Sequence, residues 1–274
     1  MSPSIGALQH RLWEPKPLAG ESWYHARIGP LDLWVRRSPE DWYVAYELEP
    51  GRDQAEVPPA PLHPAQTKAR VDRLTWNRWV AGEEAARVRL VPCMPDRAVV
   101  IRPRYPLNVP RGKEVLFFVS LPVWARVLVG EQQSTTLCEL PTVVLSNTWF
   151  GDPTSGELCY SLKTKVLRQL DMVENRAHMA VCPVLIRNQA FADLDFQRIC
   201  IRVEYLSLYR GETRLWTNQV EVQFHGEDLN STIITGRGAP DFERTAERIC
   251  VAREPTERSL LKKSFFFLKA LTGI

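Results

Sequence analysis

TVVLSNTWFGDPTSGELCYSLKTKVLRQL, residues 142–170, predicts two β-strands joined by a tight loop. An apolar run begins at Val143 and closes at Phe150, where Gly151-Asp152-Pro153 stops it, because proline cannot donate to a strand ladder. From Glu157 onward apolar and polar residues alternate, which is typical of a strand with one buried face. We therefore expect a hairpin whose loop lies at the rim of a sheet.

Short alternating segments continue on both sides of this hairpin. Leu31–Leu48 holds two alternating runs around a turn at Ser38–Asp41, which predicts a second hairpin. Glu114–Ser120, Val123–Val129 and Ile199–Tyr209 show the same strand-like patterns. Because turn residues separate these runs and no regular alternation of strands with long helices appears, the sequence predicts an all-β fold. The expected architecture is an antiparallel β-sandwich of two packed sheets with a C-terminal amphipathic helix.

Proline content indicates where the chain divides. Residues 50–66 carry five prolines and almost no large apolar side chain, so this segment is expected to be a connector. We expect residues 1–66 to form an N-terminal hairpin unit with this connector, and residues 67–245 to form the main sandwich. Residues 246–274 would then contain the helix.

The segment TERSLLKKSFFFLKALT, residues 256–272, is the part of the sequence with helical periodicity. Its leucines and most of its phenylalanines gather on one face, and Lys262, Lys263 and Lys269 on the other. Phe266 falls among the lysines, a pattern that suits a protein partner's groove or a membrane surface. The alternative is a terminal helix docked on the sheet with one exposed ring.

Composition argues against a nucleic-acid-binding protein and against a membrane-spanning one. The chain has 35 basic and 32 acidic residues, and this net charge of +3 is too small and too dispersed to indicate a nucleic-acid partner. An RNA- or DNA-binding role for Arg73, Trp76, Arg78 and Trp79 is a further alternative. We see no signal peptide and no apolar run long enough to span a bilayer, so we expect a cytoplasmic protein.

The six cysteines are isolated and form no CxxC pair, so we expect free thiols, no metal site and no cofactor. Cys159 lies inside the central hairpin and is the thiol most worth probing. The five histidines are also isolated, which argues against a histidine-rich metal centre.

The central hairpin also supplies the candidate site. Asp152 and Glu157 flank its turn, and two carboxylates across a short loop can share acid–base work. Trp149 and Tyr160 would provide a stacking platform for a sugar or a base. The alternative is that turn chemistry explains Asp152 and that core packing explains the two aromatic residues.

Several motifs together resemble a known family. These motifs are VPCMPDRAVVIRP at residues 91–103, LPVW at residues 121–124, residues 146–160 and the basic C-terminal segment. The chain is similar, from about Arg27 to its end, to an uncharacterised family of bacterial and archaeal proteins, a domain of unknown function. The resemblance implies no activity, cofactor or catalytic residue.

Two hypotheses on function follow. The first is a non-catalytic binding protein that contacts a protein partner or membrane surface through the C-terminal helix and the Trp149–Tyr160 rim. The second is a hydrolase-like enzyme that acts on a glycan or ester with Asp152 and Glu157, assisted by Cys159 or His178.

Overall fold

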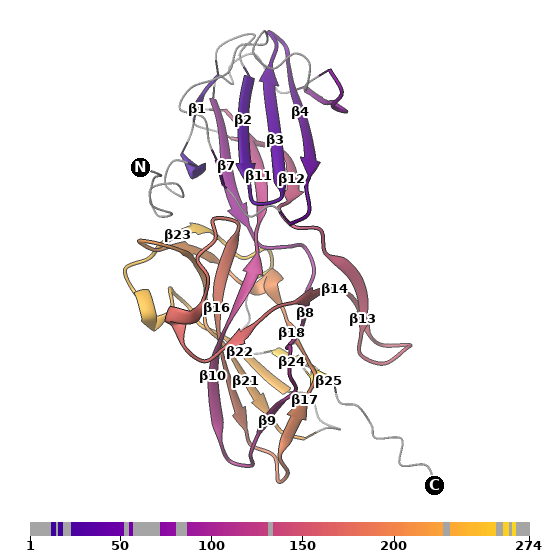
Figure 1. Cartoon of the computed structure of the whole chain (residues 1–274), viewed down its shortest axis with the longest axis vertical. Coiled ribbons are helices and arrows are strands. Elements are labelled where there is room, and N and C mark those ends of the chain that lie inside the picture. The colour runs from indigo at the N-terminus through magenta and orange to yellow at the C-terminus, as the bar shows by residue number, and fades with distance from the viewer. Residues whose placement is uncertain are drawn as a thin grey trace.

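Two units of β-structure are stacked along the long axis of the molecule, and several strands lead from one into the other (Figure 1). The computed structural model of the chain describes residues 12–14, 16–18, 23–51, 55–56, 72–80, 87–130, 134–226, 231–255, 260–262 and 265–266. In the orientation of Figure 1 we call these the upper unit and the lower unit.

The upper unit consists of two sheets. The first contains, in spatial order, β5 (Ala55–Glu56), β2 (Trp23–Ile28), β3 (Leu31–Arg37), β4 (Asp41–Leu48) and β6 (Asn77–Val80). The second contains β1 (Lys16–Pro17), β7 (Arg87–Cys93), β11 (Trp124–Val129) and β12 (Thr135–Pro141).

The lower unit contains the remaining strands. Its large sheet has the order β23 (Glu247–Cys250), β19 (Leu208–Arg210), β20 (Leu215–Thr217), β16 (Met179–Asn188), β21 (Val220–Phe224), β22 (Ser231–Thr235) and β24 (Leu260–Lys262). In the same sheet, β10 (Glu114–Pro122) pairs with β16, and β15 (Val166–Leu167) pairs with β10. A smaller sheet has the order β13 (Ser146–Phe150), β14 (Glu157–Lys163), β8 (Val99–Arg102), β18 (Arg198–Ile201) and β25 (Phe265–Phe266). The other elements are the pair β9 (Leu107–Val109) and β17 (Leu194–Phe196) and the 3-10 helices η2 (Leu170–Met172), η3 (Val203–Tyr205) and η4 (Asp241–Glu243).

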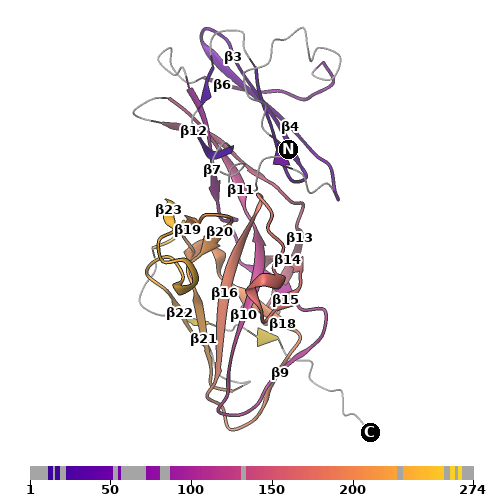
Figure 2. The same cartoon turned by 60° about the vertical axis from the view of Figure 1, so that its left-hand side comes forward.

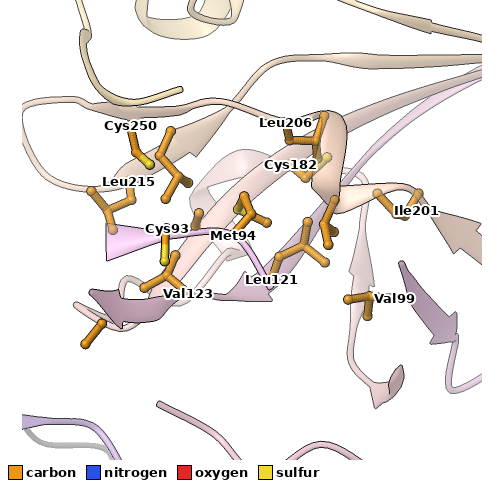
Figure 3. Packing of buried hydrophobic residues seen from close by; sticks show 14 of the residues in the cluster. Cys93, Met94, Val99, Leu121, Val123, Cys182, Ile201, Leu206, Leu215 and Cys250 are labelled. Carbon is orange, nitrogen blue, oxygen red and sulfur yellow. The ribbon is translucent and has the colours of Figure 1, made fainter. Parts of the chain in front are cut away.

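One hydrophobic cluster runs through both units. It includes Leu33 and Val35 of the N-terminal hairpin, Val127 of the second upper sheet, and Val184 and Phe224 of the lower unit. Residues on both sides of position 66 therefore contribute to one core, while the division of the chain at this position stays a prediction. Figure 3 shows part of this cluster, in which the thiols of Cys93, Cys182 and Cys250 lie among aliphatic side chains.

The all-β fold and the two predicted hairpins are confirmed. The strands form more sheets than the two that the sequence predicted. The described strands form five sheets. The pairs β8–β14, β16–β20 and β16–β21 are parallel, whereas the sequence predicted antiparallel pairing throughout. Hydrophobic alternation specifies which face of a strand is buried and not the direction of the neighbouring strand. It therefore could not predict which pairs are parallel.

The predicted C-terminal helix is wrong for the residues that the structure describes. Leu260–Lys262 form β24 against β22, and Phe265–Phe266 form β25 against β18. Lys262 and Phe266, two of the predicted docking residues, therefore belong to strands, while Lys263 and Lys269 lie outside the described residues. The edges of β22 and β18 offer backbone hydrogen bonds that the local pattern could not reveal. Among the described residues, no helix has the length and apolar character needed to cross a membrane.

The passage of the chain between the two units is held at Val123, between β10 and β11. The backbone N–H of Val123 donates to the carbonyl oxygen of His178 at 3.0 Å. Its own carbonyl oxygen accepts a hydrogen bond from Thr142 Oγ1 at 2.5 Å. Val123, Thr142 and His178 are all buried, so water cannot replace either bond. Because Thr142 lies between β12 and β13, the same contact fixes where the central hairpin begins.

Replacing Thr142 by valine is expected to destabilise the whole fold. The change keeps the shape of the side chain but leaves the buried carbonyl oxygen of Val123 without its donor, at a cost of about 1–3 kcal/mol. Equilibrium unfolding in urea measures this loss. Thr142→Ser, which retains the hydroxyl group, serves as the control, and equal stability of the two variants would contradict the role assigned to the bond.

Ending the chain after Arg258 is expected to lower stability, since it removes β24 and β25. Ladder bonds to β22 and β18 are lost with them, each worth roughly 1 kcal/mol, so we expect a loss of about 2 kcal/mol or more. The thermal midpoint of the truncated and full chains provides the comparison. An unchanged midpoint would show that these strands add nothing to the fold.

Candidate functional site

The hairpin of β13 and β14 carries the four residues that the sequence predicted as a binding site. Its strands pair in antiparallel register and form one edge of the sheet β13-β14-β8-β18-β25. Figures 1 and 2 both place the hairpin at the side of the molecule, near the junction of the two units. The predicted position at a sheet rim is confirmed.

The turn of this hairpin is held by backbone geometry and by one aromatic side chain. Trp149 Nε1 donates to the carbonyl oxygen of Asp152 at 2.9 Å, and the N–H of Gly156 donates to the same oxygen at 2.8 Å. Gly151 has a φ of +104°, a conformation that glycine adopts without strain. Both contacts use the backbone carbonyl oxygen of Asp152, so they do not decide between the two predicted roles of its carboxylate.

Alternation along β14 separates the other predicted residues. Neighbouring side chains of a strand point to opposite faces, so Leu158 and Tyr160 lie on one face while Glu157 and Cys159 lie on the other. Trp149 is the register partner of Leu158 and shares its face. The structure therefore does not gather the four residues into one site: Trp149 and Tyr160 lie on one face of the sheet, Glu157 on the other, and Asp152 in the turn.

Tyr160 lies in a mixed aromatic and charged environment. Its hydroxyl group donates to Asp96 Oδ1 at 2.8 Å, and the guanidinium carbon of Arg97 is 5.6 Å from its ring centroid. The ring centroid of Trp124 is 6.1 Å away. Burial and the hydrogen bond to Asp96 raise the pKa of Tyr160, so its hydroxyl group remains a donor at neutral pH.

A pocket of about 340 Å³ opens beside Tyr160, between the hairpin and the upper unit. Its lining residues are Leu48, Arg97, Trp124, Pro141, Val143, Val144, Leu145, Asn147 and Tyr160. The lining is mostly apolar, with the charged group of Arg97 and the amide of Asn147 as polar features, which is the usual character of a binding pocket.

Positive charge lies behind the Trp124 wall of this pocket. The guanidinium carbon of Arg253 is 5.8 Å from the Trp124 ring centroid. Arg126 Nε binds Glu139 Oε1 at 2.7 Å, and Arg253 forms an ion pair with the same carboxylate. Burial of Glu139 acts to raise its pKa, but the hydrogen bonds from Arg253 and Arg126 outweigh it and lower this pKa. Two cations thus share one anion behind Trp124.

The opposite face of the sheet holds a cluster of Glu157, Cys159, Cys200 and Arg202, which we call the thiol cluster. Arg202 Nη2 binds Glu157 Oε1 at 2.6 Å, and Arg202 Nη1 lies 2.8 Å from Cys200 Sγ. Only 3% of the Arg202 side chain is exposed, and both thiols are buried. One carboxylate oxygen of Glu157 and the sulfur atoms of Cys159 and Cys200 lie within 4.8 Å of one another.

The two thiols differ in acidity. A hydrogen bond from Cys200 lowers the pKa of Cys159. Burial raises the pKa of Cys200 well above its ordinary value, and the hydrogen bond to Cys159 acts in the same direction. Cys159 is therefore the thiol that ionises first, and Cys200 is the one that retains its proton.

Sequence reasoning missed Cys200 and Arg202 as partners of Glu157. The available signal was the spacing Glu157-x-Cys159, because residues two apart on a strand share a face, and the pair Cys200-x-Arg202 near the start of another predicted strand. This spacing could not show that the two pairs meet, since β8 lies between β14 and β18 and brings them together.

The hydrolase hypothesis stays a prediction. Glu157 is engaged by Arg202, and Asp152 lies in an exposed turn. His178 packs beneath the β2–β3 turn, where a Cβ atom on Gly29 would lie 2.4 Å from His178 Nδ1.

The residues considered for nucleic-acid binding have other roles in the upper unit. Arg78 Nη2 binds Asp41 Oδ2 at 2.7 Å. Trp76 packs edge-on against Trp23 with ring centroids 5.5 Å apart, and Trp79 packs on the main core. Trp76, Arg78 and Trp79 thus have structural partners in the upper unit, and the nucleic-acid alternative stays a prediction.

Comparison with known proteins gives one match. The family model described as protein of unknown function (DUF432) matches residues 12–269, which confirms the resemblance found in the sequence. The chain matches no curated protein and no solved structure.

Gly156→Ala is expected to destabilise the central hairpin. A Cβ atom there would lie 2.4 Å from Trp149 Nε1 and 2.7 Å from the carbonyl oxygens of Phe150 and Asp152. Overpacking of this kind costs about 1–3 kcal/mol, and it should alter the fluorescence of Trp149. Gly238→Ala is the matched control because nothing lies within 4 Å of its Cβ position. Equal unfolding midpoints for the two variants would contradict the packing of this turn.

Proposed function

We propose that this chain, which belongs to the DUF432 family, is a non-catalytic binding protein that holds an extended segment of a protein partner along β13. The observation that carries the proposal is the free edge of this strand. Among the described residues, β13 pairs with β14 alone, so one side of its backbone has no strand beside it. Such edges bind extended peptides by adding them as a further strand.

The direction of the hydrogen bonds identifies the residues that would bind the partner. The N–H of Tyr160 donates to the carbonyl oxygen of Ala98 at 2.9 Å, so the backbone groups of Tyr160 face β8. Tyr160 and its antiparallel register partner Asn147 therefore form a non-hydrogen-bonded pair, in which both residues turn their backbone groups away from the ladder between β13 and β14. Asn147, and by alternation Trp149, therefore present backbone N–H and C=O groups to the free edge.

Exposed apolar side chains lie along the same edge. Trp149 is 50% exposed and its register partner Leu158 is 45% exposed, while Val144, just before β13, is 63% exposed. Trp149 and Leu158 are neighbours across the hairpin, and an exposed apolar pair suits an interaction surface, at whose energetic centre tryptophan is frequent. A partner strand beside β13 would cover these groups.

The pocket beside Tyr160 would determine which segment is bound. Asn147 and Val144 belong both to the β13 edge and to the pocket lining, so a side chain of an added strand can enter the pocket. Trp124 and Tyr160 suit an apolar side chain, and Arg97 suits an acidic one next to it. We therefore infer an extended segment with an apolar residue flanked by Asp or Glu.

Selection of peptides from a displayed random library against the full chain tests the proposal. The expected products are extended sequences with an apolar residue beside an acidic one. Asn147→Pro removes an outward-facing N–H at an edge position that tolerates proline, and should weaken binding about tenfold. Leu158→Asp should weaken it similarly.

Phe191→Asp is the control for added charge, because Phe191 is 88% exposed and lies outside the pocket lining. It should leave binding unchanged. Selected peptides that bind Asn147→Pro as tightly as the unaltered chain would reject strand addition at β13, and so would selections that yield no such peptide.

A further inference from the structure

We propose that Glu157, Cys159 and Cys200 bind a zinc ion on the face of the sheet opposite the pocket. The three residues come from two strands separated in sequence. Glu157 and Cys159 are two apart on β14, and Cys200 belongs to β18. Cys159 and Cys200 pack with Ala98, Val100 and Phe150 in a small buried apolar cluster, so the thiols lie in an environment that excludes water.

The separations of the ligand atoms suit a single ion. Zinc binds sulfur at about 2.3 Å and carboxylate oxygen at about 2.0–2.2 Å in tetrahedral sites, which puts its ligand atoms roughly 3.3–3.8 Å apart. The carboxylate oxygen and the two sulfur atoms all lie within 4.8 Å of one another. Only a small contraction is needed to bring them onto one centre.

A disulfide does not explain the contact between the two thiols. β8 lies between β14 and β18, and strands on either side of a third are roughly 10 Å apart. A disulfide requires Cα atoms within about 7 Å, so bridging these cysteines would require the backbone to move. The side chains nevertheless converge, which suits a shared ion and not a covalent bond.

Charge balance supports the assignment. Binding of Zn²⁺ would release the protons of both thiols, and the ion and the guanidinium of Arg202 would then offset the charges of the two thiolates and of the Glu157 carboxylate. Glu204 adds a further carboxylate beside Arg202. Arg202 is almost fully buried and lies within hydrogen-bond distance of both Cys200 Sγ and Glu157 Oε1. It would therefore orient these two ligands from outside the coordination sphere. Thiolate ligands favour zinc over calcium or magnesium.

Glu157 is the proposed ligand that meets solvent. The side chain of Glu157 is 36% exposed, whereas the sulfur atoms are enclosed. Three protein ligands leave a fourth position for water or another small ligand.

The test uses the full chain, reduced and stripped of metal with a chelator. Zinc affinity is measured by competition with a chromophoric chelator, and Co²⁺ serves as the spectroscopic probe. We expect one ion per chain, with a cobalt spectrum that shows thiolate charge-transfer absorption and the intense visible bands of tetrahedral coordination. Weak zinc binding without a thiolate band in the cobalt spectrum would overturn the proposal.

Variants assign the ligands. Cys159→Ser and Cys200→Ser should each weaken zinc binding by more than the roughly 10–100-fold typical of an outer-shell loss, and Arg202→Met should fall within that range. Glu157→Gln keeps the packing and should lower affinity while preserving the thiolate band. Cys138→Ser, a free thiol on β12 outside the cluster, should have no effect. Equal affinity of the Cys159→Ser, Cys200→Ser and Cys138→Ser variants would overturn the assignment.

The proposal is independent of peptide binding at β13. Far-UV circular dichroism of each variant verifies the fold. Loss of zinc binding with intact peptide binding would separate the two sites.

Discussion

The position of Val123 is the constraint on which the rest of the structure depends. Here the chain leaves the large lower sheet after β10 and enters the upper unit as β11 (Figure 1). Both backbone groups of Val123 are bonded in a buried environment, the N–H to His178 and the carbonyl oxygen to Thr142. These two bonds connect segments that belong to both units, and they satisfy polar groups that the core would otherwise leave without water. Leu121 and Val123, on either side of Pro122, also belong to the hydrophobic cluster that runs through both units.

The central hairpin takes its position from the same crossing. Thr142 leads from β12 toward β13, and β14 then pairs with β8, the strand that follows the other crossing at Cys93–Ala98. As a result β14 has two different surroundings. One face adjoins the pocket and the exposed Trp149–Leu158 pair, while the other joins the buried thiols and Arg202. A single strand thus contributes to both proposed sites, and its alternation keeps them apart.

The errors of the sequence predictions share a physical origin. The C-terminal segment has a lysine and phenylalanine pattern that fits a helix, but short strands form there because β22 and β18 offer edges to pair with. The run Ile199–Tyr209 alternates like one long strand, yet β18 ends at Ile201 and a 3-10 turn follows. Arg202 lies at this interruption, where its guanidinium binds Glu157. In both segments a tertiary contact overrides the local pattern.

The sequence by itself determined the all-β class, a hairpin within residues 31–48 and another within residues 142–170, the rim position of Trp149, and membership of the family. These depend on local alternation, turn residues and motif identity, all of which are readable along the chain. The strands of the second hairpin, Ser146–Phe150 and Glu157–Lys163, are shorter than the sequence predicted. Only the tertiary structure decided that Glu157 and Cys159 face Cys200 and Arg202, that Tyr160 lines a pocket with Trp124, and that β13 has a free edge. Alternation specifies the face on which a side chain lies, but long-range strand pairing decides which distant side chain shares it.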